Sequence, residues 1–307
     1  MRTATAGEMS VMARFSPLKW ILVFTLIGAF LGCSDSTPLE HTQARQKVSL
    51  SGTFLTESPD EINFPVKVLF AIDCSLSMGM TADGAMVGSD PNFLRIAAVR
   101  NFIEEYNSNE NVSFEIMLWS NDVFSRTRNG DGDYGFTKDP DELNRVLDGV
   151  YNDTLTDYIG TLDTIRTDIQ NDIDRTEDSD NLVRTKYIVA FFSDGVSNDG
   201  SGLQDDDDIW DQVEDMYNYA IDEGVGSFAF HTFLLLSGFD DTTAGQTALG
   251  LATTTLTGMS ERGNGQFRTM ENAEAIDFIS IIDMRLTVEY NIKYLVAFNY
   301  NVQRGLE

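Results

Sequence analysis

The chain has 307 residues, of which 49 are acidic and 21 are basic, so its formal net charge at pH 7 is −28. A surface this acidic repels nucleic acid and anionic lipid, which argues against both as partners, and it attracts divalent cations and basic proteins. Solubility in a salty or crowded extracellular medium is the simpler explanation of the same charge.

The first 32 residues have the pattern of an export signal rather than of part of the fold. Arg14 and Lys19 form a positive region, and the apolar run from Trp20 to Phe30 is too short for a comfortable membrane span. We therefore expect residues 1–32 to be a signal peptide.

A cysteine lies directly at the end of this apolar run. The pair Gly32-Cys33 resembles the end of a bacterial lipoprotein signal, in which the cysteine is lipidated and becomes the mature N-terminus. The resemblance implies that Cys33 carries lipid, that the protein is exported to the bacterial cell envelope and that it meets the membrane through the lipid anchor only. Ser34 favours the outer membrane over the inner one under the sorting rule of enteric bacteria. The alternative is an ordinary cleaved signal, with no special role for Cys33.

The rest of the chain divides by composition into four segments. Residues 33–46 are polar and form a predicted tether, and residues 47–61 hold a predicted edge strand at Val48–Leu55 and a linker. Residues 62–284 form one predicted domain. Residues 285–307 hold two β-rich runs, which either pair with Val48–Leu55 as a small β appendage or extend the edge of the main sheet.

Strands and helices alternate throughout the predicted domain. We expect strands at 66–73, 112–120, 185–193, 226–236 and 265–269, and helices at 92–107, 140–149, 156–175, 207–223, 243–257 and 272–284. This alternation predicts an α/β fold with a doubly wound, mostly parallel sheet flanked by helices.

Oxygen-bearing side chains follow two of the apolar strands. Asp73, Ser75 and Ser77 come at alternate positions where the strand 66–73 ends, and Asp194 follows the strand 185–193. Ligands of open α/β sheets bind at the carboxyl ends of the strands, where these residues are expected to lie. Carboxylates and hydroxyls with little total charge suit Mg²⁺ best among the divalent ions, with Mn²⁺ and Ca²⁺ as alternatives. The simpler interpretation is that these residues cap helices and build turns.

The three loops together resemble the von Willebrand factor A (VWA) domain and its metal-ion-dependent adhesion site. The pattern of that site is Asp-x-Ser-x-Ser, then Thr, then Asp, which Asp73, Ser75, Ser77, Thr156 and Asp194 match in type and order. The resemblance covers roughly residues 62–284 and implies a VWA/Rossmann-like fold.

The resemblance also implies how the metal is held and used. Ser75, Ser77 and Thr156 would bind it directly, and Asp73 and Asp194 partly through water. The partner would be a protein that offers an Asp or Glu carboxylate to the metal, so the chain would be an adhesion or assembly module. Thr154 and Thr161 are alternatives to Thr156, which we prefer because its spacing to the following helix fits the family.

Two other classes of function compete with metal-dependent binding. One is a structural envelope lipoprotein whose metal only stabilises the fold. The other is a metal-dependent hydrolase, which the sequence disfavours. Phosphatases with an aspartyl nucleophile need a second Asp where Ser75 stands, and neither His41 nor His231 has an obvious partner as a base. We therefore predict no enzymatic activity.

Four further features have simple interpretations. Cys74 is predicted to be a small buried residue rather than a reactive thiol. The segment 129–135 resembles a calcium loop but lacks the required glycine and glutamate, which favours a surface turn. The run Asp205–Asp208 is predicted to cap a helix, with a second cation or a basic partner as the alternative. The loop 78–92, which is rich in methionine and glycine, is either a contact surface or a plain surface loop.

Overall fold

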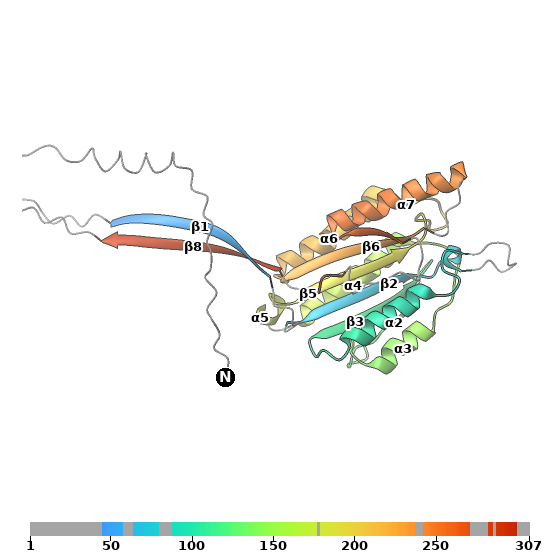
Figure 1. Cartoon of the computed structure of the whole chain (residues 1–307), viewed down its shortest axis with the longest axis horizontal. Coiled ribbons are helices and arrows are strands. Elements are labelled where there is room, and N and C mark those ends of the chain that lie inside the picture. Colours follow the sequence, from blue (N-terminus) through green and yellow to red (C-terminus); the bar gives the residue numbers. More distant parts are fainter. Residues whose placement is uncertain are drawn as a thin grey trace, which may run out of the picture. The chain divides into compact units, whose positions relative to one another are not determined.

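The computed structural model of the protein describes residues 45–57, 64–79, 88–176, 179–236, 242–270, 282–284 and 287–299 (Figure 1). The chain divides into two units, a larger one that spans Gly52–Ile292 and a smaller one that joins the two terminal segments. The predicted export signal, the tether and Cys33 lie outside the described residues. Among the described helices, none is long and apolar enough to cross a membrane.

A six-stranded sheet forms the centre of the larger unit. Its strand order is β4-β3-β2-β5-β6-β7. The strands are β2 (Val66–Asp73), β3 (Val112–Trp119), β4 (Val123–Arg126), β5 (Lys186–Ser193), β6 (Ser227–Leu235) and β7 (Phe267–Met270). All neighbouring pairs are parallel except β3 and β4. Because β2 and β5 are neighbours at the centre of the sheet, the loops that follow them lie side by side.

Helices cover both faces of this sheet. Helices α2 (Leu94–Tyr106) and α3 (Pro140–Asp148) pack on one face, and α4 (Tyr158–Arg175), α6 (Asp206–Asp222) and α7 (Thr243–Arg262) pack on the other. Residues of β2 are buried on both faces, which explains why this strand is an almost continuous apolar run. The predicted fold class, a doubly wound and mostly parallel α/β sheet flanked by helices, is confirmed.

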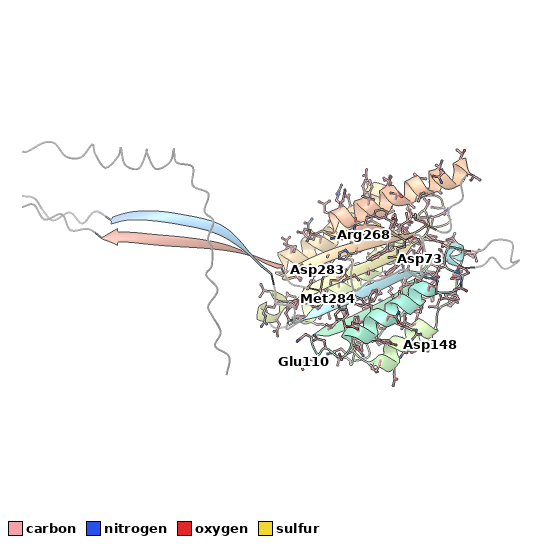
Figure 2. All side chains as sticks on the ribbon, in the orientation of Figure 1. Asp73, Glu110, Asp148, Arg268, Asp283 and Met284 are labelled. Atoms are coloured by element: carbon pink, nitrogen blue, oxygen red, sulfur yellow. The ribbon has the colours of Figure 1, made fainter. Side chains whose placement is uncertain are left out.

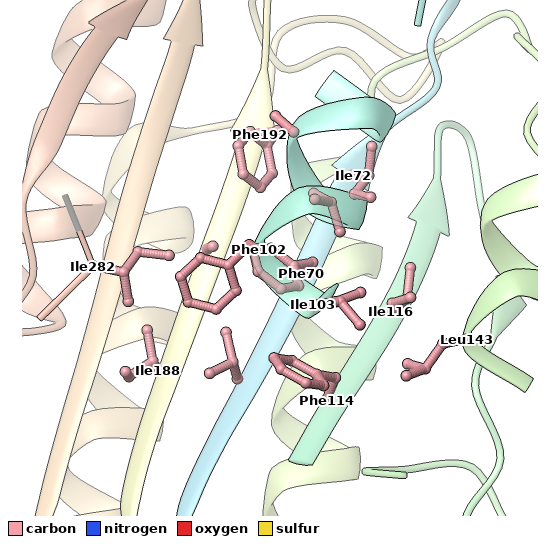
Figure 3. Packing of buried hydrophobic residues seen from close by; sticks show 14 of the residues in the cluster. Phe70, Ile72, Phe102, Ile103, Phe114, Ile116, Leu143, Ile188, Phe192 and Ile282 are labelled. Atoms are coloured by element: carbon pink, nitrogen blue, oxygen red, sulfur yellow. The ribbon is translucent and has the colours of Figure 1, made fainter. Parts of the chain in front are cut away.

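Aromatic rings fill the core under α2 (Figure 3). Phe70 of β2 meets Phe102 of α2 edge to face, with ring centroids 5.5 Å apart. Phe192 of β5 stacks on Phe233 of β6 at 4.8 Å. Contacts of this kind fix the central strands against each other and so fix the loops at their ends.

Several element boundaries differ from the prediction. The short strand β4 and the short helix α5 (Ser179–Leu182) were not predicted, and α7 continues to Arg262 rather than ending at 257. All four residues of β4, Val-Phe-Ser-Arg, are half-buried. The strand therefore lacks the alternation of buried and exposed residues that marks a strand in a sequence. The predicted helix 272–284 lies mostly outside the described residues, and residues 282–284 are not helical.

Two long strands form a separate two-stranded sheet. They are β1 (Arg45–Glu57) and β8 (Thr287–Asn299). The first contains the predicted edge strand, and the second joins the two predicted C-terminal β-rich runs into one strand. The predicted pairing of the N- and C-terminal segments as a small β appendage is therefore confirmed.

Candidate metal centre

The first loop of the candidate site begins where β2 ends. The Oδ1 of Asp73 accepts a hydrogen bond from the backbone N–H of Ser75 at 2.6 Å, which turns the chain away from the strand. A single turn of 3-10 helix, Leu76–Met78, follows and brings Ser77 back beside Ser75, with their hydroxyl oxygens 3.0 Å apart. Cys74 lies in the core with the residues that face α2, as predicted.

The third loop lies beside the first because β5 is the neighbour of β2. The hydroxyl of Ser193 donates to the Oδ2 of Asp73 at 2.7 Å. The hydroxyl of Ser77 donates to the Oδ1 of Asp194 at 2.7 Å. A continuous series of hydrogen bonds therefore joins Ser75, Ser77 and Asp194, and Ser193 ties Asp73 to the same edge. Figure 2 shows Asp73 at the end of the sheet opposite Glu110.

The second loop, which holds Thr156, makes backbone contacts with both of the other loops. Thr156 is buried, and its backbone exchanges two hydrogen bonds with Asn198, on the loop after β5, at 3.0 and 2.8 Å. The neighbouring Asp153 forms a bridge with Ser75 of the first loop. No described residue makes a hydrogen bond with the Thr156 hydroxyl, so its oxygen is available to a ligand.

The alternatives to Thr156 are less suitable. Thr154 is exposed to solvent. The Thr161 hydroxyl donates to the carbonyl of Asp157 within its own helix at 2.7 Å, which uses its hydrogen. The role of Thr156 as the threonine of the site stays a prediction.

Ser89 is a member of the cluster that the sequence did not indicate. Its hydroxyl donates to the Oδ2 of Asp194, and its backbone N–H donates to the carbonyl of Ser77 at 2.9 Å. The residue is twelve positions after Ser77, and no local pattern marks it.

A buried ion pair holds the backbone at the start of the first loop. The Nη1 of Arg95 lies 2.7 Å from the Oδ2 of Asp90, and both side chains are fully buried. Asp90 also accepts from the backbone N–H groups of Leu94 and Arg95 at the start of α2. The Nε of Arg95 donates to the backbone carbonyl of Asp73 at 3.1 Å. An Asp just before a helix is a local signal for a cap, but nothing local shows that Arg95 is buried.

Both carboxylates of the site are held away from water. Burial raises the pKa of Asp73 above its ordinary value, although hydrogen bonds from Ser193 and Ser75 oppose this. Burial and then the negative charge of Asp73 raise the pKa of Asp194 to about 8. Arg95 is a cation that acts on both groups, and Asp90 already engages it. Two buried carboxyl groups in this state favour an additional positive charge between them.

The donor atoms of the cluster fit a hard divalent cation. They are carboxylate and hydroxyl oxygens, which Mg²⁺ prefers to nitrogen or sulfur. Within the described part of the chain, no group of three or more His, Cys, Asp and Glu side chains could hold a metal ion. A metal at this edge would therefore depend on the hydroxyls of Ser75, Ser77 and Thr156 beside its two carboxylates.

The loop 129–135 is held by its own residues. The side-chain oxygen of Asn129 accepts from the backbone N–H groups of Asp131 and Asp133 at 3.0 and 3.1 Å. The guanidinium of Arg128 donates to the carbonyl of Gly132 at 2.6 Å. These bonds close a turn at the surface.

The acidic run before α6 is explained in part by local contacts. The Oδ1 of Asp205 accepts from the backbone N–H of Asp207 at 3.0 Å and caps the helix. Asp206 accepts from the hydroxyl of Thr255 on α7. Asp207 and Asp208 are exposed to solvent.

We expect Asp205→Ala to lower the free energy of unfolding by about 1 kcal/mol, because it removes this cap. Asp208→Ala, which removes an equal charge from the same turn without removing a cap, is the matched control and should cost less than half as much. Urea unfolding of both variants measures the difference. Equal losses would contradict a capping role for Asp205.

Comparison with known proteins finds similarity among solved structures only. No family model and no curated protein matches the sequence. The chain is similar to the von Willebrand factor domain of the type V pili tip protein Mfa5 from Porphyromonas gingivalis, at 12% identity and a TM-score of 0.45, over 68% of this chain and 91% of that one. It is similar to the PilB minor pilin from Streptococcus sanguinis, at 11% identity and a TM-score of 0.45, over 71% of this chain and 60% of that one. A third is a von Willebrand factor type A protein from Catenulispora acidiphila, at 11% identity and a TM-score of 0.41, over 76% of this chain and 46% of that one. We draw no functional conclusion from likenesses of this size.

Proposed function

We propose that this protein is a lipid-anchored protein of the bacterial cell envelope that binds a protein ligand through a divalent cation. The cation, Mg²⁺ in the first place, would be held by Asp73, Ser75, Ser77, Thr156 and Asp194. The observation that supports this most directly is the hydrogen-bonded series of the Ser75, Ser77 and Asp194 side chains. It lies beside the buried carboxylate of Asp73, which accepts hydrogen bonds from the backbone N–H of Ser75 and the hydroxyl of Ser193.

The low negative charge of this donor set would leave the bound cation able to bind a carboxylate of a partner protein. Three of the five proposed ligands are neutral hydroxyls, so the donor set carries fewer negative charges than an all-carboxylate site. The bound cation would supply a positive centre that accepts one carboxylate oxygen of a partner. Asp194 would orient the Ser77 hydroxyl through the hydrogen bond that it already accepts, and Asp73 would hold the backbone of Ser75.

The anchor and the location are proposed from the N-terminal sequence. Cys33 would carry the lipid, and residues 33–46 would separate the membrane from the domain. The acidic surface of the domain would be repelled by anionic lipid headgroups, so only the lipid anchor would contact the membrane.

The described residues offer little support for catalysis. The chain has two histidines, and His41 lies outside the described residues. His231 is buried on β6, and its Nδ1 accepts from the backbone N–H of Gln266 at 3.2 Å. Burial lowers the pKa of His231 to about 4, so the imidazole is a weak base and is neutral at pH 7. His231 is also far in sequence from the residues of the candidate centre. We therefore propose a binding protein rather than a hydrolase.

The test is capture of envelope proteins by the full chain with Mg²⁺ and with EDTA. The proposal expects capture that requires Mg²⁺, that is lost in Asp73→Asn and that is kept in Glu110→Gln. Glu110 is exposed, and the control removes one carboxylate charge at the other end of the sheet (Figure 2). Stabilisation by Mg²⁺ without any Mg²⁺-dependent capture would favour the structural lipoprotein instead. Capture that changes neither with EDTA nor in Asp73→Asn would overturn the proposal.

The affinity for Mg²⁺ is expected to rise with pH and then to level off. Below the pKa of Asp194, about 8, protons compete with the metal for the carboxylate. The dissociation constant should therefore fall by up to about tenfold for each pH unit between about pH 6 and 8, and change little above that range. Calorimetric titration in two buffers of different ionisation enthalpy measures both the affinity and the proton released. An affinity independent of pH with no proton release would show that Asp194 does not face the metal.

A further inference from the structure

A further buried carboxyl group lies outside the candidate metal centre, in the middle of β3. Glu115 is fully buried, and neither of its carboxyl oxygens has a hydrogen-bond partner in the described part of the chain. Because side chains alternate along a strand, Glu115 shares a face with Met117 and Trp119. Those two residues belong to the core that includes α4. Glu115 therefore points toward the layer of α4.

The cations on this face are already paired. Arg126 of β4 binds Asp168 of α4 with both carboxylate oxygens, at 2.8 and 2.6 Å. Lys67 of β2 forms an ion pair with Asp172, one turn further along α4. The hydroxyl of Tyr187 on β5 also donates to Asp172. The charges that act on Glu115, those of Asp168, Asp172 and Arg126, thus all belong to ion pairs that are already formed.

The charge of the cluster is balanced when Glu115 is protonated. Three carboxyl groups face two cations, so an ionised Glu115 would leave one uncompensated negative charge in a buried layer. Burial, and then the negative charges of Asp168 and Asp172, raise the pKa of Glu115 well above its ordinary value. The charge balance and the direction of this pKa shift therefore both favour the neutral acid in the folded protein.

We propose that Glu115 is a buried proton-binding site that controls how tightly α4 docks on the sheet. When the carboxyl group ionises, its proton goes to solvent and a third negative charge faces Asp168 and Asp172. Repulsion then acts on α4, since both aspartates lie on that helix. This inference is independent of the proposed metal-dependent function. Because α4 starts two residues after Thr156, its loosening reaches the second loop of the candidate centre.

The sign of the pH effect follows from the direction of the pKa shift. A carboxyl group with a raised pKa in the folded state stabilises the fold at low pH, and this contribution is lost as the pH rises toward the folded-state pKa. Ionisation of Glu115 therefore destabilises the protein at alkaline pH, and replacement by a neutral isostere should prevent this.

The test compares the full chain with Glu115→Gln and with Glu110→Gln as the matched control. Infrared spectra at pH 7 should show the C=O band of a buried protonated carboxyl group in the wild type and in Glu110→Gln. Glu115→Gln should lack the component of this band that belongs to Glu115, while the buried carboxyl group of Asp194, whose pKa is about 8, contributes a component in all three proteins. As the pH rises from the ordinary pKa range of a glutamate toward the raised folded-state pKa, the unfolding equilibrium constant of the wild type should rise by up to about tenfold per pH unit relative to Glu115→Gln. Amide exchange in α4 should be faster in the wild type than in Glu115→Gln at the alkaline end only.

The outcomes separate a proton-binding site from a merely buried residue. If the infrared band of Glu115→Gln is as intense as that of the wild type, or if this variant follows the same pH dependence as the wild type, the proposal is wrong. Asp172→Asn is a second variant in case Glu115→Gln does not fold. It removes one negative neighbour and releases Lys67, so the band should disappear at a lower pH than in the wild type. An unchanged titration of the band in Asp172→Asn would also overturn the proposal.

Discussion

Asp73→Asn is expected to abolish stabilisation by Mg²⁺ while leaving the protein in EDTA at least as stable as the wild type at pH 8. The reason is that Asp73 is a fully buried acid whose pKa is raised by burial, so its ionised form costs free energy unless a cation compensates it. An amide of the same shape avoids that cost but leaves the metal with one carboxylate fewer. The substitution also removes the negative charge that helps to raise the pKa of Asp194.

Thermal and urea unfolding of the full chain with Mg²⁺ and with EDTA measures this prediction. With Mg²⁺ at about one hundred times its dissociation constant, the wild type should gain about 2.7 kcal/mol and the variant nothing. Glu110→Gln should gain as much as the wild type. A wild type that gains nothing would remove the basis of the metal proposal. A variant that gains as much as the wild type would place any bound metal elsewhere.

Arg95→Met is expected to cost about 3–5 kcal/mol of stability, because it leaves Asp90 as a buried carboxylate without its partner. The Arg95 side chain also holds the carbonyl of Asp73, so the response to Mg²⁺ should weaken as the first loop loses its support. Arg100→Met is the matched control. It lies on the same helix and pairs with the exposed Asp148, so its loss should cost about 0–1 kcal/mol.

Urea unfolding of Arg95→Met, Arg100→Met and the double variant Arg95→Met/Asp90→Asn tests whether the loss of stability comes from the unpaired Asp90 carboxylate. The double variant should recover part of the stability, since no charge is then left buried and unpaired. Equal losses in Arg95→Met and Arg100→Met would show that the buried pair has no special role. A double variant less stable than Arg95→Met alone would show that Asp90 acts mainly as the cap of α2.

Local patterns predicted the central part of the fold well. The run Val66–Asp73 was predicted as a buried strand and has those bounds, because a strand covered on both faces needs apolar residues at every position. The side chains of Asp73, Ser75 and Ser77 were expected to share one edge, and the structure brings Ser75 and Ser77 to within hydrogen-bond distance. Their role as metal ligands stays a prediction.

Long-range partners could not be predicted in the same way. Ser89 and Arg95 take part in the candidate centre because of the path of the chain after Ser77, which no local pattern encodes. Glu115 lies in a largely apolar strand, and its raised pKa follows from burial and then from the positions of Asp168 and Asp172 on α4, which the local sequence does not indicate. Strand β4 was missed because a short, half-buried strand carries neither of the two periodic signals.

The order of strands in the sheet also has a kinetic consequence. The bond between Ser193 and Asp73 joins residues that are 120 positions apart, and it requires β5 to lie directly beside β2. Closing a loop of that length costs entropy before any contact compensates it, so this parallel pairing is expected to form late in folding. A partly folded chain would then have no complete set of donor atoms. Mg²⁺ should accordingly slow unfolding without accelerating folding, and metal occupancy would report that the centre of the sheet has closed.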